Sequence, residues 1–199
     1  MGYSLAWLAV RGKPREAVLK ALDLQDTGQR EEIAESEING AELPGGWYLV
    51  IKDHEDHVAS DKVVAELSLG HEAVTCFVEE HCTFSCAAGW KDGRKAWSVT
   101  HDSSRKRRGL EIEGTPPEMF GPVREDLTSK QTKADVEKRG VDYIFDIPVE
   151  LAKHITGYRH DMDIPGLEKT AFEVLKQNRD VQQPPSMQVP ESKPWWKFW

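Results

Sequence analysis

An alternating stretch in the middle of the chain constrains the fold most strongly. Between Val74 and Trp90, a row of mostly apolar or small residues takes every second position, with more polar residues between them. The row consists of Val74, Cys76, Val78, Glu80, Cys82, Phe84, Cys86, Ala88 and Trp90. A period of two residues is typical of strands that bury one face. The stretch therefore predicts central strands whose alternate side chains share one buried face.

Asp92-Gly93 predicts the tight turn that follows these strands. A two-residue hairpin turn needs positive φ angles, which Asp and Gly tolerate. Taking this pair as the whole loop fixes a register in which both strands present the same face to the core. The expected cross-strand pairs are Trp90 with Lys95, Ala88 with Trp97, Cys86 with Val99, and Phe84 with His101.

Helical and extended segments are mixed along the rest of the chain. The sequence predicts strands over residues 3–10, 47–51, 110–113 and 141–147, and a short edge strand near Ile33. It predicts helices over residues 14–24, 60–67, 115–127, 148–155 and 170–176. Because regular βαβ alternation is missing, this order favours an α+β fold. We expect one α+β domain over residues 1–178, with a central antiparallel sheet flanked by helices, and a Pro-rich linker and aromatic tail over residues 179–199.

The composition fits one folded, soluble domain and limits its partners. The chain has 199 residues, of which 30% are charged and 39% hydrophobic, with a formal net charge of −8. This negative balance gives no general attraction for nucleic-acid phosphates. We interpret the one basic run, residues 105–108, as a solvated surface loop rather than a phosphate-binding patch. The sequence therefore predicts no nucleic-acid partner.

Cysteine usage and hydropathy favour a cytoplasmic location. Cys76, Cys82 and Cys86 are odd in number and lie in one short region, which favours a reducing compartment over a disulfide framework. No apolar run reaches the length of about 18 residues that would predict a transmembrane segment. The N-terminal residues lack the basic and apolar regions of a secretory signal.

The C-terminal tail is unusually aromatic. Four of its last five residues are large aromatics, Trp195, Trp196, Phe198 and Trp199. Each can bury roughly 150–250 Å², so together they exceed the apolar patch usual on a soluble monomer. We expect them to be covered by the same domain, by a protein partner or by lipid. They are candidate partner-binding residues, and peripheral membrane contact through the tail is an alternative.

Glu80, His101 and Cys82 are the candidate catalytic residues. If the alternation continues through the middle strand, their side chains point to the same face as the core residues. A carboxylate beside an imidazole can form an acid/base pair with shifted pKa values, and a thiol can act as a nucleophile. The competing interpretation makes residues 79–81 a turn at the sheet margin, where both charged groups reach water. It treats the cysteine as a small hydrophobe.

The remaining motifs do not predict a metal or cofactor site. The cysteines and the His54-x-x-His57 pair lack the spacing of a zinc module. Residues 160–163 resemble the start of a calcium loop, but the required glycine is missing and Pro165 interrupts the segment. The chain has neither a Gly-rich phosphate loop nor a Gly-x-Ser-x-Gly hydrolase motif. We expect no metal and no cofactor.

Three segments resemble a family of small bacterial proteins that has no assigned activity. They are residues 2–10 (GYSLAWLAV), residues 43–48 (LPGGWY), and Glu79-Glu80-His81 followed by the Trp90-Lys91-Asp92-Gly93 hairpin. The likeness covers roughly residues 1–175 and leaves out the tail. It implies a bacterial, cytoplasmic, stand-alone domain, and it assigns no catalytic residue.

Together these observations favour a non-catalytic protein that binds a protein partner. The most specific form of this hypothesis is a toxin-neutralising, immunity-type protein, because a small acidic domain is suited to steering a basic partner. The alternative is a small enzyme that uses Glu80 and His101, with Cys82 as a further candidate.

Overall fold

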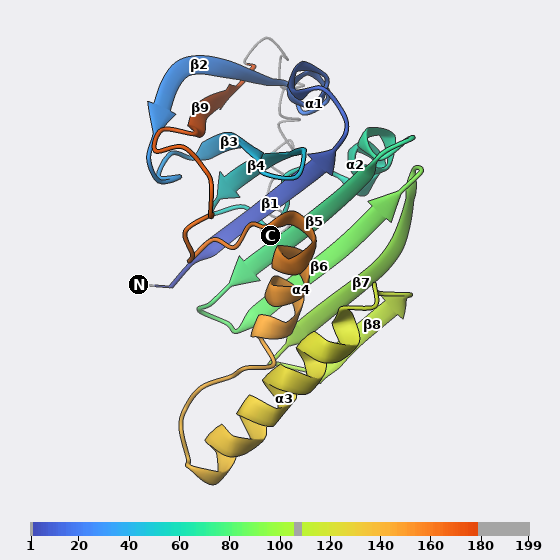
Figure 1. The fold of residues 1–199 in the computed structure, drawn as a ribbon, viewed down its shortest axis with the longest axis vertical. Helices are drawn as coiled ribbons and strands as arrows, with labels where there is room; N and C mark the ends of the chain where they lie inside the picture. The colour runs from blue at the N-terminus through green and yellow to red at the C-terminus, as the bar shows by residue number, and fades with distance from the viewer. Residues whose placement is uncertain (1, 106–108, 179–199) are drawn as a thin grey trace, which may run out of the picture.

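A single nine-stranded antiparallel sheet with four helices makes up the part of the chain that the computed structural model describes, residues 2–105 and 109–178 (Figure 1). The strands are β1 (Ser4–Arg11), β2 (Leu24–Glu31), β3 (Ile38–Leu43), β4 (Trp47–Asp53), β5 (Glu72–Glu79), β6 (Phe84–Lys91), β7 (Arg94–Asp102), β8 (Leu110–Gly114) and β9 (Phe172–Gln177). The helices are α1 (Arg15–Ala21), α2 (Asp61–Leu67), α3 (Phe120–Val136) and α4 (Asp146–Thr156). The strand order is β2-β9-β3-β4-β1-β5-β6-β7-β8. The predicted α+β fold with a central antiparallel sheet is confirmed.

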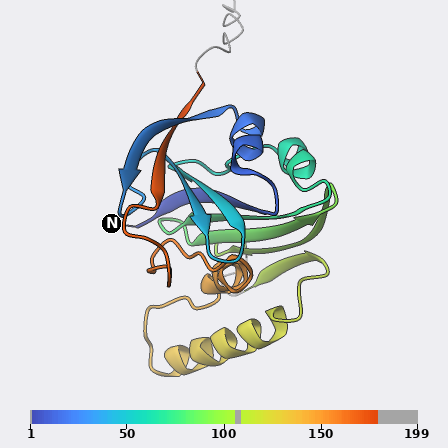
Figure 2. The same ribbon diagram turned by 45° about the horizontal axis from the view of Figure 1, so that its top comes forward.

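Helices cover both faces of the sheet, which creates two hydrophobic cores (Figure 2). α4, with α3 beside it, packs on one face, and α1 and α2 pack on the other. β1 lies near the middle, and all its residues from Leu5 to Val10 are buried. Trp7 belongs to the α4 side and Leu8 to the α1 side, so a strand covered on both faces has a continuous apolar sequence.

The alternating stretch forms two strands, and the residues that face the α4 core have even numbers in the first strand and odd numbers in the second. Residues 80–83 form a turn between β5 and β6, and Cys76 pairs with Ala87 across it. Cys76 and Ala87 face the α4 core, whereas Phe77 and Ala88 pack on the α2 side. The expectation that residues 74–90 present one shared face is therefore wrong, because the turn between the strands shifts the parity by one residue.

A β-bulge at Gly89 and Trp90 changes the expected hairpin register. Trp90 does pair with Lys95, as predicted, but Trp97 pairs with Gly89 instead of Ala88. Beyond the bulge the other pairs shift as well, to Ala87 with Val99, Cys86 with Thr100, Ser85 with His101, and Phe84 with Asp102. A side-chain Cβ at position 89 would overlap the Trp97 indole, so the glycine permits this close approach.

Two segments near the C-terminal half adopt a different structure from the one predicted. Residues 170–176 were expected to be helical, but β9 forms there because it fills the gap between β2 and β3, burying Phe172 and Leu175. Residues 141–147 do not form a strand. The Asp142 carboxylate accepts hydrogen bonds from the backbone N–H groups of Ile144 and Phe145, at 3.0 and 3.3 Å, and this turn leads into α4.

The other predicted elements agree with the structure apart from their ends. The predicted edge strand near Ile33 is an exception and is wrong: the edge strand β2 ends at Glu31, and Ile33 lies in the following loop. Lys106–Arg108 and the tail residues Trp195, Trp196, Phe198 and Trp199 lie outside the described residues. No helix in the described part of the chain is both long and apolar enough to cross a bilayer.

Candidate functional site

The structure does not join Glu80 to His101, two of the three residues predicted to be catalytic, by a hydrogen bond or ion pair among the described residues. Glu80 and Cys82 lie in the turn between β5 and β6, and Cys82 is exposed. One Glu80 oxygen accepts a hydrogen bond of 3.0 Å from the Tyr3 backbone N–H, and the other lies 3.9 Å from Nε2 of His160. His101 is fully buried in β7, and no hydrogen bond or ion pair among the described residues joins it to Glu80. The predicted Glu80–His101 pair is not assembled in this structure.

His101 instead pairs with Asp142. Its Nδ1 lies 3.0 Å from the Gly109 carbonyl oxygen, and its Nε2 lies 3.4 Å from an Asp142 carboxylate oxygen. Burial opposes a charge on the ring, but the Asp142 carboxylate and the Gly109 carbonyl outweigh it and raise the pKa of His101. The carboxylate and the carbonyl oxygen are both acceptors, so each favours a proton on the ring nitrogen that faces it, and the imidazolium form is favoured. The contact with Asp142 also links β7 to the segment before α4.

Ser85 does not form a nucleophilic triad with this pair. Ser85 is the cross-strand partner of His101, and both residues are fully buried. Its hydroxyl, however, donates to the Phe145 carbonyl at 2.6 Å. Since Gly109 and Asp142 face the two ring nitrogens, His101 offers no nitrogen to accept the serine proton. These contacts link β6 and β7 to the segment around the start of α4.

The two cysteines within the sheet are not activated as nucleophiles. Burial raises the pKa of Cys76 well above its usual value and that of Cys86 to about 11. Both remain thiols at neutral pH, and the thiolate is the reactive form.

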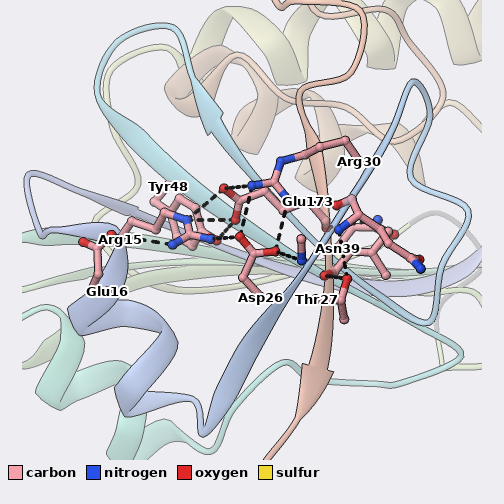
Figure 3. Close-up of polar contacts among 11 residues, drawn as sticks. Arg15, Glu16, Asp26, Thr27, Arg30, Asn39, Tyr48 and Glu173 are labelled. Atoms are coloured by element: carbon pink, nitrogen blue, oxygen red, sulfur yellow. Dashed lines mark hydrogen bonds and ion pairs between the residues drawn. The ribbon is translucent and has the colours of Figure 1, made fainter.

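A network of charged residues links α1 to strands β2, β4 and β9 near one edge of the sheet (Figure 3). Nε of Arg15 donates to both carboxylate oxygens of Glu173, at 2.8 and 2.9 Å, and the Tyr48 hydroxyl donates to one of them at 2.7 Å. Asp26 accepts from Arg15 at 2.6 Å and from Arg30 at 3.0 Å. The side-chain hydrogen bond to Glu173 raises the pKa of Arg15, against the effect of burial. Every cation here has a carboxylate partner, so the network joins elements without leaving a charge for a ligand.

A second network surrounds Arg159, directly after α4. Its guanidinium donates to Asp161 and Glu150 at 2.6 Å each and to Asp146 at 2.8 Å. The groove between α3 and α4, with a volume of about 520 Å³, is also lined by charges that pair with one another: Lys130 lies 2.7 Å from Asp126. The charged groups in these places satisfy one another.

A hollow next to Arg159 differs, and we call it the His160 hollow. Its volume is about 470 Å³, and its lining includes Tyr3, Ile33, Arg159, His160, Met162 and Phe172. It lies where the start of β1, the β2–β3 loop and the α4–β9 connection meet. Figures 1 and 2 both show this connection running beside the N-terminus. Gly157 directs the chain there: it ends α4 with φ of 83°, a left-handed conformation that favours glycine.

His160 is buried in the hollow without a hydrogen-bond partner among the described residues. Its side chain is only 2% exposed, and its ring packs edge-on against Tyr3 at a centroid distance of 4.8 Å. Burial lowers its pKa, so the ring is neutral at pH 7 even though Glu80 lies nearby. In the sequence, His160 stands out only as the first residue of a calcium-like segment, and the one local signal of its burial is the Tyr158-Arg159-His160 run after the helix-ending Gly157.

Three exposed apolar side chains surround the His160 hollow. Tyr3, Ile33 and Met162 are 45%, 65% and 50% exposed, and all three line it. Within the described ranges, no group of three or more His, Cys, Asp or Glu side chains is arranged to hold a metal ion. The hollow therefore presents exposed apolar contact surface beside a buried imidazole.

Comparisons of this chain with protein-family models, with curated proteins and with solved structures found no match.

Proposed function

We propose that this chain is a non-catalytic protein-binding module, and that its most specific role is that of a toxin-neutralising, immunity-type protein in the bacterial cytoplasm. One observation carries the proposal: Tyr3, Ile33 and Met162 are exposed together around one hollow. Apolar side chains gathered at a concave surface are typical of sites that bind another protein. The net charge of −8 supports a basic partner, which an acidic surface attracts.

The enzyme alternative has less support. A general acid or base must lie within hydrogen-bond reach of the proton that it transfers on a substrate. Glu80 faces His160, whereas His101 is fully buried and faces Asp142. An enzyme that uses Glu80 and His101 stays a prediction, as does a role for Cys82.

Photo-crosslinking at Ile33 tests the binding proposal. A photoreactive phenylalanine analogue at position 33 should trap one discrete protein in cells of the source organism. The same analogue at Val136, which is 80% exposed on α3, serves as the control. If the proposal is correct, the adduct forms at position 33 and not at 136, and expressing this chain relieves growth arrest caused by the trapped protein. Identical adducts at both positions, or none, would contradict it.

The aromatic tail is proposed as a second contact with the partner. Deleting residues 179–199 should weaken capture through position 33 if Trp195, Trp196, Phe198 and Trp199 contribute. If the tail binds lipid instead, the full chain should co-sediment with anionic liposomes, and the truncated chain should not.

A further inference from the structure

We propose that the His160 hollow binds a peptide segment of the partner in which lysine or arginine flanks a bulky apolar residue. This inference rests on the proposed function and specifies the chemistry of the partner at the same site. Three independent features of the hollow support it: its apolar lining, its unpaired rim carboxylates and its unpartnered imidazole.

The apolar lining predicts the anchor residue. Leu5, Ile51 and Phe172 are buried beneath the hollow, and Ile33 and Met162 stand exposed at its rim. The volume of about 470 Å³ falls within the range of pockets that enclose a small organic group. A large apolar side chain entering here would cover surface that water now contacts, which is the main source of binding energy at interface centres.

The rim charges predict the flanking residues. Glu32, Asp163 and Glu168 line the hollow, and all three are exposed. None has an ion pair or side-chain hydrogen bond to another residue in the ranges 2–105 and 109–178. The Arg159 guanidinium is held by carboxylates, which leaves Lys169 as the one lining cation without an ion pair to any described residue. The unpaired charge is mainly negative, so the hollow attracts cations and repels acidic segments.

The imidazole favours a peptide over a hydrocarbon chain. A neutral histidine has one nitrogen that donates and one that accepts. Neither nitrogen of His160 has a hydrogen-bond partner among the described residues, and Nε2 lies 3.9 Å from a Glu80 oxygen. A peptide backbone carries N–H and C=O groups that match both requirements, whereas an acyl chain carries neither.

NMR titration of the full chain tests the inference with a defined probe, acetyl-Lys-Phe-Lys-amide. At low salt, we expect saturable shift changes confined to residues 2–5, 32–34 and 158–169. Acetyl-Glu-Phe-Glu-amide and acetyl-Lys-Gly-Lys-amide, which lack the charge and the anchor respectively, should bind at least about threefold more weakly. Equal binding of the acidic peptide, shift changes elsewhere, or no binding of acetyl-Lys-Phe-Lys-amide would overturn the inference.

Matched variants separate the contribution of the apolar lining from that of the rim carboxylates. Ile33→Ser removes an apolar contact, and the double variant Glu32→Gln/Glu168→Gln removes two rim charges. Each change should lower the affinity for acetyl-Lys-Phe-Lys-amide by about threefold to tenfold. Val136→Ser and Glu118→Gln change one exposed apolar and one exposed acidic residue away from the hollow, and should leave binding unchanged. If the peptide fails to bind while crosslinking at Ile33 still captures a protein, the partner chemistry is wrong and the proposed function stands.

Discussion

At the scale of single residues, Gly89 determines how β6 and β7 pair. The Trp97 indole lies where a Cβ of residue 89 would be. Gly89→Ala should therefore destabilise the protein by about 1–3 kcal/mol, because the indole or the strand must move. Urea denaturation measures this. Gly121→Ala in α3 is the control: a Cβ there meets nothing within 4 Å, so the change should be neutral or slightly stabilising. Equal stability of the two variants would contradict the packing at Gly89.

His160 gives a second prediction at this scale. Burial lowers its pKa in the folded state below the ordinary value of about 6.5. As the pH falls from about 6.5 toward that lowered pKa, the unfolded chain binds a proton that the folded chain does not, so stability decreases. His160→Phe should flatten this part of the pH profile, because phenylalanine does not titrate. It should also be at least as stable at pH 7, since it removes an unpartnered buried polar group. An unchanged pH profile in the variant would show that His160 is not the titrating group.

At the scale of elements, Arg15 joins α1 to β9 through Glu173, whose side chain is only 12% exposed. Arg15→Met removes the guanidinium N–H that both carboxylate oxygens share and should cost about 3 kcal/mol of unfolding free energy. Arg30→Met removes a more exposed cation, with a side chain 38% exposed, and should cost less than about 1 kcal/mol. The double variant Arg15→Met/Glu173→Leu should recover part of the loss. Equal costs for the two single variants would show that the buried pair contributes no more than the exposed one.

At the scale of the whole molecule, the described members of the two cores lie between Leu5 and Leu175. β9 ends at Gln177, and the Asn178 N–H donates to the Asp23 carbonyl at 2.9 Å. A chain ending at residue 178 should therefore unfold in one transition, with a free energy within about 0.5 kcal/mol of the full chain. Calorimetry and urea denaturation measure this. A loss of several kcal/mol would indicate that the aromatic tail packs against its own domain instead of serving a partner.

The elements whose signals are local can be predicted from the amino-acid sequence. Periodicity predicts the apolar strands β1 and β4 and the apolar stripe of α2. The φ angles that Asp and Gly allow predict the Asp92-Gly93 turn. Together these elements indicate the α+β class. Features that depend on distant neighbours are set by packing between segments and follow only from the folded structure. β9 is a strand because β2 and β3 offer it free edges, although its local sequence resembles a helix.

The contacts of the candidate site also depend on distant neighbours. Glu80 meets His160, and His101 meets Asp142, because a four-residue turn and a one-residue bulge redirect side chains across the sheet. Such pairings are set by contacts between segments up to 80 residues apart along the chain, and a pattern read within one segment carries no information about them.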